Sequence, residues 1–297
     1  MSEPAADRAI RKLNWLEPVA DFIQNVVGGI YERLGAPGRL LKDLLHGTKP
    51  LGHPLHPALT DVPLGAWTAA VVADYAAYVS HAIPPSAGGL ALAVGTLAAL
   101  AAALAGYTDH HETFGHERRV ATAHGLIMTT VILVMVLSQV LRLEGGGGAR
   151  AAAVGLATVG LLLGLLGAYL GGHLTYAMGT MVNRNAFAEA PEDFVPVGTP
   201  KDFPDGVLKR VKAGAMAVLM VRTEGRLNAI AAVCSHAGGP LDEGDLQGDI
   251  VVCPWHGSRF CVRDGRVKGG PATFPLPSFL VRERAGKVEV KIDQPPH

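Results

Sequence analysis

The chain has 297 residues, of which 49% are hydrophobic and 18% charged, and its 26 basic and 26 acidic residues cancel at pH 7. Zero net charge removes any whole-chain electrostatic case for nucleic-acid binding, so we expect no nucleic-acid partner. Three cysteines cannot all pair with one another, and a disulfide framework is therefore a poor interpretation. The hydrophobic excess lies between about residues 57 and 173, so two unlike halves are expected.

Residues 1–50 are predicted to form an N-terminal amphipathic helical segment. Within it, apolar side chains follow one helical face at Trp15, Val19, Phe22, Ile23, Val26, Val27, Ile30 and Leu34. This pattern suits a helix that lies on a membrane surface, and it equally suits a helix packed against the C-terminal domain.

Four apolar stretches follow, near 58–79, 88–107, 120–141 and 151–170, and each is long enough to cross a bilayer as a helix. Their many glycines and alanines favour close helix packing in lipid. A soluble bundle is disfavoured because the stretches lack a polar stripe. We therefore predict a four-span transmembrane bundle at 51–182, a linker at 183–193 and a C-terminal domain at 194–297.

Basic residues are unevenly shared between the two sides of the predicted bundle. The loop at 142–150 carries only Arg142 and Arg150 near span ends. The side that holds the N-terminal segment, the loop at 108–119 and the C-terminal domain carries Arg8, Arg11, Lys12, Arg33, Arg39, Lys42, Lys49, Arg118 and Arg119. By the positive-inside rule, this second side is cytoplasmic, and we expect a multi-pass protein of the cytoplasmic membrane.

Histidines gather near the cytoplasmic ends of the predicted spans. His56 opens the first span, His124 lies about one turn inside the third, and His173 closes the fourth. Ionisable groups at membrane depth are costly and are therefore functional candidates. A b-type haem ligated by these histidines is one interpretation; another metal, a quinone or proton-handling pocket, and purely structural roles are the others.

From about residue 194 the pattern changes to short β-branched runs separated by DG and EG turns, which is typical of an antiparallel all-β domain. Two loops of this domain carry Cys234-x-His236 and, after sixteen intervening residues, Cys253-x-x-His256. Two thiolates and two imidazoles can bind either zinc or a [2Fe-2S] cluster, and the spacing alone does not choose between them. We expect Cys261, the third cysteine, to be a small buried residue.

The whole stretch "CSHAGGPLDEGDLQGDIVVCPWHGSRF", followed by "GGPATFPLPSF" at 269–279, resembles Rieske iron–sulfur domains. The resemblance implies a [2Fe-2S] cluster in which Cys234 and Cys253 hold one iron, His236 and His256 hold the other, and the proline-containing loop covers the site. It also implies that the Ser258 hydroxyl tunes the cluster by a hydrogen bond to sulfur.

This sequence departs from the high-potential Rieske type at three positions. Gly239 and Trp255 stand where that type has a disulfide, and Phe260 stands where it has a tyrosine. We therefore expect a midpoint potential in the lower part of the Rieske range of about −150 to +300 mV.

The membrane half is also familiar. "LGHPLHPALTDVPLGAW" at 51–67, His124-Gly125 and "YLGGHLTYAMG" at 169–179 resemble a bacterial four-helix membrane domain of unknown function that is often joined to a Rieske domain. The sequence thus predicts a membrane-anchored electron carrier or oxidoreductase that exchanges electrons with a redox partner protein or a quinone, with membrane lipid around the bundle. The alternative is a tethered ferredoxin whose membrane half is only an anchor. We expect no mononuclear-iron oxygenase domain.

Overall fold

The structure is a computed structural model that describes residues 5–80, 82–84, 86–144 and 146–294. The chain forms two compact units. The first comprises Met1–Arg39 with Leu55–Gly179, and the second comprises Leu40–Pro54 with Thr180–His297. A helical unit followed by an antiparallel β unit confirms the predicted fold class.

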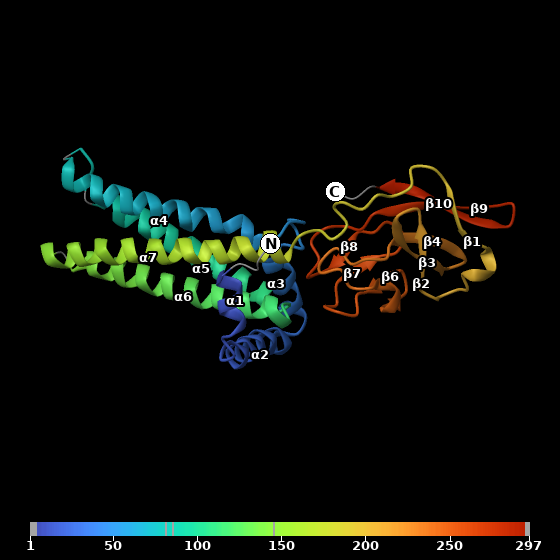
Figure 1. Ribbon diagram of the computed structural model, residues 1–297, viewed down its shortest axis with the longest axis horizontal. Coiled ribbons are helices and arrows are strands. Elements are labelled where there is room, and N and C mark those ends of the chain that lie inside the picture. Colours follow the sequence, from blue (N-terminus) through green and yellow to red (C-terminus); the bar gives the residue numbers. More distant parts are fainter. Residues whose placement is uncertain (1–4, 81, 85, 145, 295–297) are drawn as a thin grey trace. The chain divides into compact units, whose positions relative to one another are not determined.

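The helical unit is built from α1 (Ala5–Arg11), α2 (Leu16–Leu34), the start of α3 (Ala36–His46), α4 (Leu55–Val79), α5 (Ser86–His110), α6 (Gly115–Leu143) and α7 (Gly147–His173), which ends in a π-helical turn, η1 (Leu174–Met178). Helices α4 to α7 lie side by side (Figure 1) and pack in a closed ring, because α4 contacts both α5 and α7, and α6 contacts the same two helices. All four are long and apolar enough to cross a membrane. They overlap the four predicted spans and are each longer by several residues.

Glycines let the bundle helices approach large side chains closely. A Cβ atom at Gly95 would lie 2.7 Å from the Trp67 ring, and one at Gly106 would lie 2.8 Å from the His56 ring. Trp67 is fully buried between α4 and α5. The glycine-rich composition therefore creates sockets for specific side chains, in addition to general close packing.

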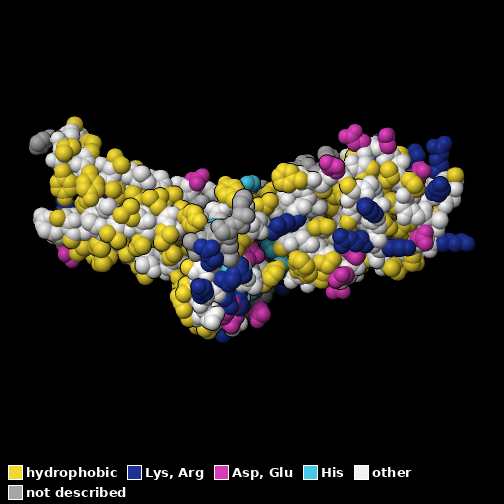
Figure 2. Space-filling model, in the orientation of Figure 1, with side chains coloured by type: hydrophobic (Ala, Val, Ile, Leu, Met, Phe, Trp, Pro, Cys, Tyr) yellow, Lys and Arg dark blue, Asp and Glu magenta, His cyan; other side chains and the backbone are white. Residues whose placement is uncertain are grey.

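The outward faces of the long helices are apolar. Figure 2 shows hydrophobic side chains over most of the visible face of α4 to α7, whereas charged side chains gather over α1, over α2 and over the β unit. Leucines and valines on these helices, such as Leu90, Leu133 and Leu162, are more than half exposed. Such a surface suits lipid rather than water.

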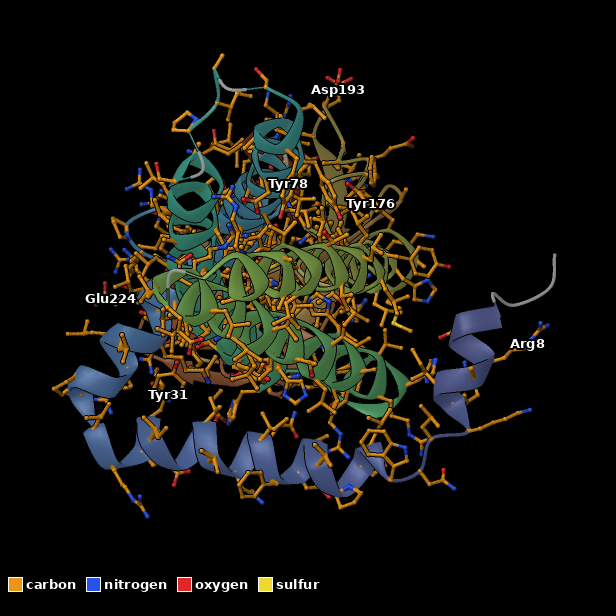
Figure 3. All side chains as sticks on the ribbon, turned by 90° about the vertical axis from the view of Figure 1, so that its left-hand side faces the viewer. Arg8, Tyr31, Tyr78, Tyr176, Asp193 and Glu224 are labelled. Carbon is orange, nitrogen blue, oxygen red and sulfur yellow. The ribbon has the colours of Figure 1, made fainter. Side chains whose placement is uncertain are left out.

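Helix α2 crosses beside the bundle (Figure 3) and is held there by polar contacts. Tyr31 Oη and Thr108 Oγ1 share a hydrogen bond of 2.6 Å, and Gln24 Nε2 donates to the carbonyl oxygen of Thr113 at 2.9 Å. Arg118 forms ion pairs with Glu17 and Asp21. These contacts use one face of α2, so its apolar residues on the other face stay exposed.

One ion pair is buried within the bundle. Asp74 of α4 and Arg142 of α6 form two hydrogen bonds, at 2.8 and 2.5 Å, and the Asp74 side chain is 0% exposed. A paired carboxylate is tolerated at this depth, whereas an unpaired charge is strongly unfavourable. The pair therefore ties the first span to the third.

The β unit contains two antiparallel sheets. The six-stranded sheet has the order β1 (Val195–Gly198), β10 (Lys287–Gln294), β9 (Ser278–Arg284), β4 (Arg226–Ala231), β3 (Met216–Thr223) and β2 (Lys209–Ala213). The four-stranded sheet has the order β5 (Asp245–Gln247), β6 (Ile250–Val252), β7 (Arg259–Cys261) and β8 (Val267–Gly269). Short 3-10 turns occur at η2 (Pro200–Asp202) and η3 (Leu241–Glu243).

The unit boundaries differ from the predicted domain limits in two places. Residues 183–193 are predicted as a linker, yet Asn185 is 2% exposed and its Nδ2 donates to the carbonyl oxygen of Val233 at 2.9 Å. Leu40–Pro54, which includes the end of the predicted N-terminal segment, clusters with the β unit. Contacts between residues distant in sequence thus extend the β unit in both cases.

We predict that Asp74→Leu lowers the free energy of unfolding by about 3–5 kcal/mol, because it leaves the Arg142 guanidinium buried without its carboxylate. The double variant Asp74→Leu/Arg142→Leu recovers most of this loss, since it removes both charges. Thermal or steric-trap unfolding in detergent micelles measures the effect. Asp61→Asn, at an exposed carboxylate of the same helix, is the control and leaves stability within about 0.5 kcal/mol. Equal losses in the single and double variants would contradict the prediction.

Candidate metal centre

The two predicted ligand pairs lie in two loops that close in the same way. The first loop follows β4, and the second joins β6 to β7. In each, the N–H of a glycine four residues after the cysteine donates to the cysteine carbonyl oxygen: Gly238 to Cys234 at 3.0 Å, and Gly257 to Cys253 at 3.1 Å. Each cysteine N–H in turn donates to the carbonyl oxygen five residues on, at 2.9 and 2.8 Å.

Both of these glycines have positive φ, 88° at Gly238 and 71° at Gly257. This conformation is strained for other residues and explains a glycine at the same offset from each cysteine. The repeated Cys-x-x-x-Gly spacing is a signal of paired loops that the sequence analysis did not use. It shows that the two loops are structurally equivalent supports.

The loops bring the four side chains into two neighbouring pairs. The Cys234 and Cys253 thiols are hydrogen-bonded to each other and are 1% and 3% exposed. The His236 and His256 ring centroids lie 4.9 Å apart with nearly perpendicular planes. Both imidazoles are partly exposed, so the sulfur end of the site is buried and the imidazole end reaches the surface.

The local electrostatics favour sulfur in its anionic form at one position. The hydrogen bond from Cys234 lowers the pKa of Cys253 to about 6, and the backbone N–H groups of Trp255 and His256 lower it further against burial. The same thiol–thiol bond, together with burial, raises the pKa of Cys234 well above its ordinary value. Both thiols must lose their protons when a metal binds.

Ser258 and Gly239 complete the sulfur end. The Ser258 side chain is fully buried, and its hydroxyl acts to lower the pKa of Cys234. A Cβ atom at Gly239 would lie 2.7 Å from Cys253 Sγ and 3.2 Å from the Trp255 ring, so only glycine fits there. Phe260 is fully buried in β7 and brings no hydroxyl to the site.

The donor set fits a binuclear centre. Two buried sulfurs receive backbone N–H and hydroxyl hydrogen bonds, and two imidazoles form a separate pair, so each pair can hold one iron. Within the ranges that the structure describes, no three His, Cys, Asp or Glu side chains are grouped to hold a single metal ion. Cys261 is free and buried in β7, as expected.

The structure brings two of the three membrane histidines together. The His56 ring of α4 and the His124 ring of α6 lie 6.1 Å apart between centroids, at 78°. His56 Nδ1 donates to the carbonyl oxygen of Ala102 at 2.8 Å, and His124 Nδ1 donates to that of Gly167 at 2.9 Å. Because each Nδ1 carries the proton, each Nε2 presents a lone pair.

His173 has a different environment. Its Nε2 lies 3.6 Å from Asp7 Oδ1, and the same oxygen forms a 2.5 Å hydrogen bond with His116 Nε2. Asp7 belongs to α1 and His116 to the first turn of α6. This cluster ties the N-terminal helix to the ends of α6 and α7.

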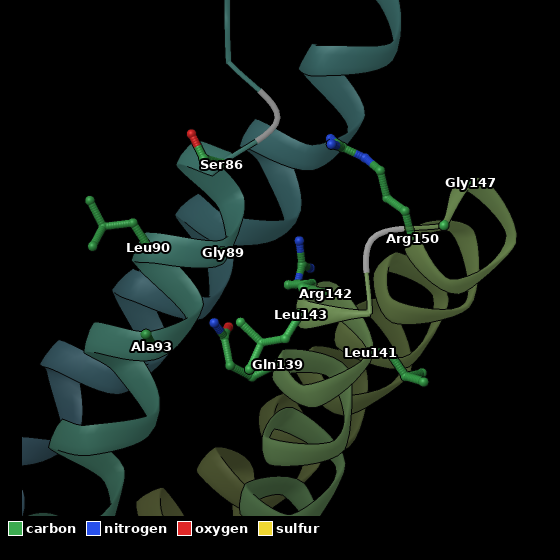
Figure 4. A pocket seen from close by; sticks show the side chains of 11 residues that line it. Ser86, Gly89, Leu90, Ala93, Gln139, Leu141, Arg142, Leu143, Gly147 and Arg150 are labelled. Carbon is green, nitrogen blue, oxygen red and sulfur yellow. The ribbon is translucent and has the colours of Figure 1, made fainter.

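A separate pocket of about 640 Å³ lies where α5 begins and α6 ends (Figure 4). Its polar lining comes from Gln139, Arg142 and Arg150, and leucines such as Leu90 supply the apolar part. Gln139 Oε1 is buried without a hydrogen-bond partner.

A β domain that presents two thiols and two imidazoles from paired loops, joined to a helical unit able to cross a membrane, defines an iron–sulfur electron-transfer protein. Comparison with known families agrees. Residues 193–280 match the Rieske [2Fe-2S] domain, and residues 52–184 match the family described as Predicted membrane protein (DUF2231).

Curated relatives share about a third of the chain. The biphenyl 2,3-dioxygenase ferredoxin component of Rhodococcus jostii is 36% identical over 92 residues, 31% of this chain and 86% of that protein. Ferredoxin CarAc of Metapseudomonas resinovorans is 34% identical over 33% of this chain and 92% of its own length. The cytochrome b6-f complex iron-sulfur subunit of Chlorobaculum tepidum is 34% identical, and the match spans only 52% of its length.

Among solved structures, a complex of reduced oxygenase and oxidized ferredoxin in carbazole 1,9a-dioxygenase matches with 31% identity and a TM-score of 0.33, over 36% of this chain and 99% of that one. The chain belongs to the Rieske [2Fe-2S] family and carries a membrane-protein domain ahead of its Rieske domain.

We predict that Cys253→Ala abolishes cluster binding, because one iron loses half of its protein ligands. Cys261→Ala is the matched control: it removes the third thiol, which lies outside the site, and keeps the cluster. Iron and sulfide counts per chain, with visible circular dichroism, measure both. Retention of a full cluster in Cys253→Ala would refute the ligand assignment.

Proposed function

We propose that this protein is a membrane-anchored electron carrier whose Rieske domain lies on the cytoplasmic side of the inner membrane. The observation that carries the proposal is the joining of a complete ligand set, Cys234, His236, Cys253 and His256, to four helices long and apolar enough to span a bilayer. The bound [2Fe-2S] cluster would supply reversible one-electron transfer.

The protein side chains divide the work at this site. The buried cysteines and Ser258 keep water from the sulfur end and supply hydrogen bonds that favour extra negative charge. The partly exposed His236 and His256 rings give an outlet toward a partner. Trp255, half exposed beside His256 at 6.4 Å between ring centroids, adds an apolar contact next to that outlet.

The partner is a redox protein or a quinone. Relatives named as ferredoxin components favour a protein that docks at the imidazole edge. A quinone is the alternative partner, but the pocket around Gln139 lies at the end of the bundle opposite the Rieske domain in the predicted topology and gives a quinone no direct route to the cluster.

Orientation and lipid contact follow from charge and exposure. Basic residues concentrate on the side that holds the N-terminal segment and the Rieske domain, which supports a cytoplasmic location. On α2, Phe22 is 68% exposed and Ile30 is 48% exposed, whereas the opposite face packs on the bundle. We infer that this apolar face lies in the membrane interface.

A second redox group is supported by His56 and His124. Two imidazoles with backbone-anchored Nδ1 atoms and a 6.1 Å centroid separation would hold one b-type haem, which would supply one-electron transfer. The His56 ring packs against Gly106 and the His124 ring against Gly171, so glycine at these positions fixes where the two rings lie. Electrons would then pass between the Rieske cluster and this membrane site. Without a haem, the protein is a tethered ferredoxin whose helical bundle is only an anchor.

We predict that inside-out membrane vesicles treated with dithionite, which does not cross the bilayer, develop a Rieske-type EPR signal at once, whereas right-side-out vesicles do not. The reason is the cytoplasmic position of the cluster domain. The midpoint potential falls in the lower part of the range of about −150 to +300 mV, because Phe260 supplies no hydroxyl.

Replacing dithionite with a short-chain quinol distinguishes a quinone partner from a protein partner. Reduction of the cluster by the quinol assigns a quinone, and no reduction assigns a protein. A signal that forms first in right-side-out vesicles would reverse the proposed orientation, and a midpoint potential near the top of the range would contradict the tuning argument.

We predict that the purified protein shows a Soret band and low-spin haem signals, and that His56→Ala and His124→Ala each abolish them. His173→Ala is the matched comparison: its imidazole is held by Asp7, so it keeps the spectrum. Optical and EPR spectra with haem counted per chain provide the measurement. A protein that retains its Rieske signal but has no haem rejects this site and leaves the tethered ferredoxin.

A further inference from the structure

The loop that covers the cluster site, residues 270–277 between β8 and β9, is held by a segment from the other end of the sequence. Residues 43–53 belong to the same compact unit and lie along this loop. We call them the strap. Thr48, at the centre of the strap, is 5% exposed, and the neighbouring His46 is fully buried.

Four contacts join the strap to the loop and to the strand before it. Asp43 Oδ1 accepts a hydrogen bond from the Gly270 N–H at 2.8 Å, and Thr48 Oγ1 donates to the Ala272 carbonyl oxygen at 3.1 Å. Lys49 Nζ donates to the carbonyl oxygen of Lys268 at 2.7 Å. The His53 ring meets the Phe274 ring edge-on, with centroids 6.2 Å apart.

Ala272 connects the strap to the cluster ligands. Its carbonyl oxygen is held by Thr48, and its N–H donates to Ser258 Oγ at 3.1 Å. Because Ser258 Oγ accepts this bond, its own hydroxyl proton is left to point at the neighbouring Cys234 sulfur. A displacement of Ala272 therefore changes the hydrogen bond on the Cys234 sulfur.

The strap and loop 270–277 are tightly packed against each other. A Cβ atom at Gly270 would lie 2.5 Å from Thr48 Oγ1 and 3.2 Å from Asp43 Oδ1, so the loop backbone lies directly against the strap. Ala272 and Ser258 are both fully buried. Buried, mutually polarised hydrogen bonds of this kind transmit small shifts rather than absorbing them.

We propose that Thr48 is a positioning residue for Ser258: through Ala272, the strap sets the hydrogen bond on the Cys234 sulfur and so raises the midpoint potential of the Rieske centre. The proposal rests on cluster binding at the four ligands. Hydrogen bonds to cluster sulfurs favour the reduced, more negative form, so a weaker bond lowers the potential. The strap continues directly into α4, and the first span is therefore covalently continuous with the element that tunes the cluster.

The test uses the full chain with its cluster, in detergent or nanodiscs, and EPR-monitored redox titration. Thr48→Val keeps the shape and removes the hydroxyl; we expect a lower midpoint potential and shifted g-values. The shift does not exceed that of Ser258→Ala, because Thr48 acts through Ser258. Thr48→Ser keeps the hydroxyl and restores the wild-type values. Thr68→Val is the matched control: it removes a hydroxyl that bonds the Leu64 carbonyl oxygen within α4, and it leaves the potential unchanged.

Non-additivity gives the sharpest readout. In the Ser258→Ala background, Thr48→Val has no further effect on the potential, because the group that it positions is absent. Full additivity, or an unchanged potential in Thr48→Val alone, would overturn the proposal. If Thr48→Val fails to assemble, Thr48→Ala serves instead, and a shift of the same sign is expected. Faster amide exchange at residues 270–274 in either variant reports the released loop without reference to redox state.

Discussion

Two short loops, each closed on its own cysteine, are the constraint on which the rest of the site depends. The Gly238-to-Cys234 and Gly257-to-Cys253 hydrogen bonds fold each loop so that a thiol points inward and an imidazole lies beside it. The four ligand side chains are thereby carried by two rigid loops, with one cysteine and one histidine in each. The strands that precede and follow these loops then fix only the relative position of the two loops. Strand β4 leads into the first loop, and the β6–β7 hairpin carries the second.

The remaining structure protects or exposes parts of this pair of loops. Gly239 leaves room for Cys253 Sγ and the Trp255 ring, and loop 270–277 is bonded to Ser258 through the Ala272 N–H. The imidazole end has no such cover, since His236 and His256 stay partly exposed. Because the sulfur end is buried and the imidazole end is partly exposed, electron exchange with a partner is expected at the imidazole end.

The ligands could be predicted from sequence because their chemistry is local: the Cys-His spacings and the residues between them are readable along the chain. The four long helices were predicted for a similar reason, since lipid imposes continuous apolar stretches. Their ends were underestimated because polar residues such as His110 continue a helix that the apolar pattern no longer marks. The bounds of the three-residue strands β5 to β8 could not be predicted, because three residues are too few to show alternation.

Contacts between distant residues were beyond such reasoning. No pattern in "DLLHGTK" indicates that Asp43 meets Gly270, 227 residues away, or that Asn185 is buried against Val233. The pairing of His56 with His124, and of His173 with Asp7, likewise depends on how helices rotate within the bundle, which glycine sockets such as Gly106 decide.

The strap has a consequence for biogenesis. It leaves the ribosome before any of the four spans, whereas its binding surface on the Rieske domain is translated after all of them. The cluster domain is therefore completed only when the earliest part of that unit meets the latest, after the intervening helices have been inserted. The connectivity of the chain thus makes the completed β unit depend on residues from both sides of the helical bundle.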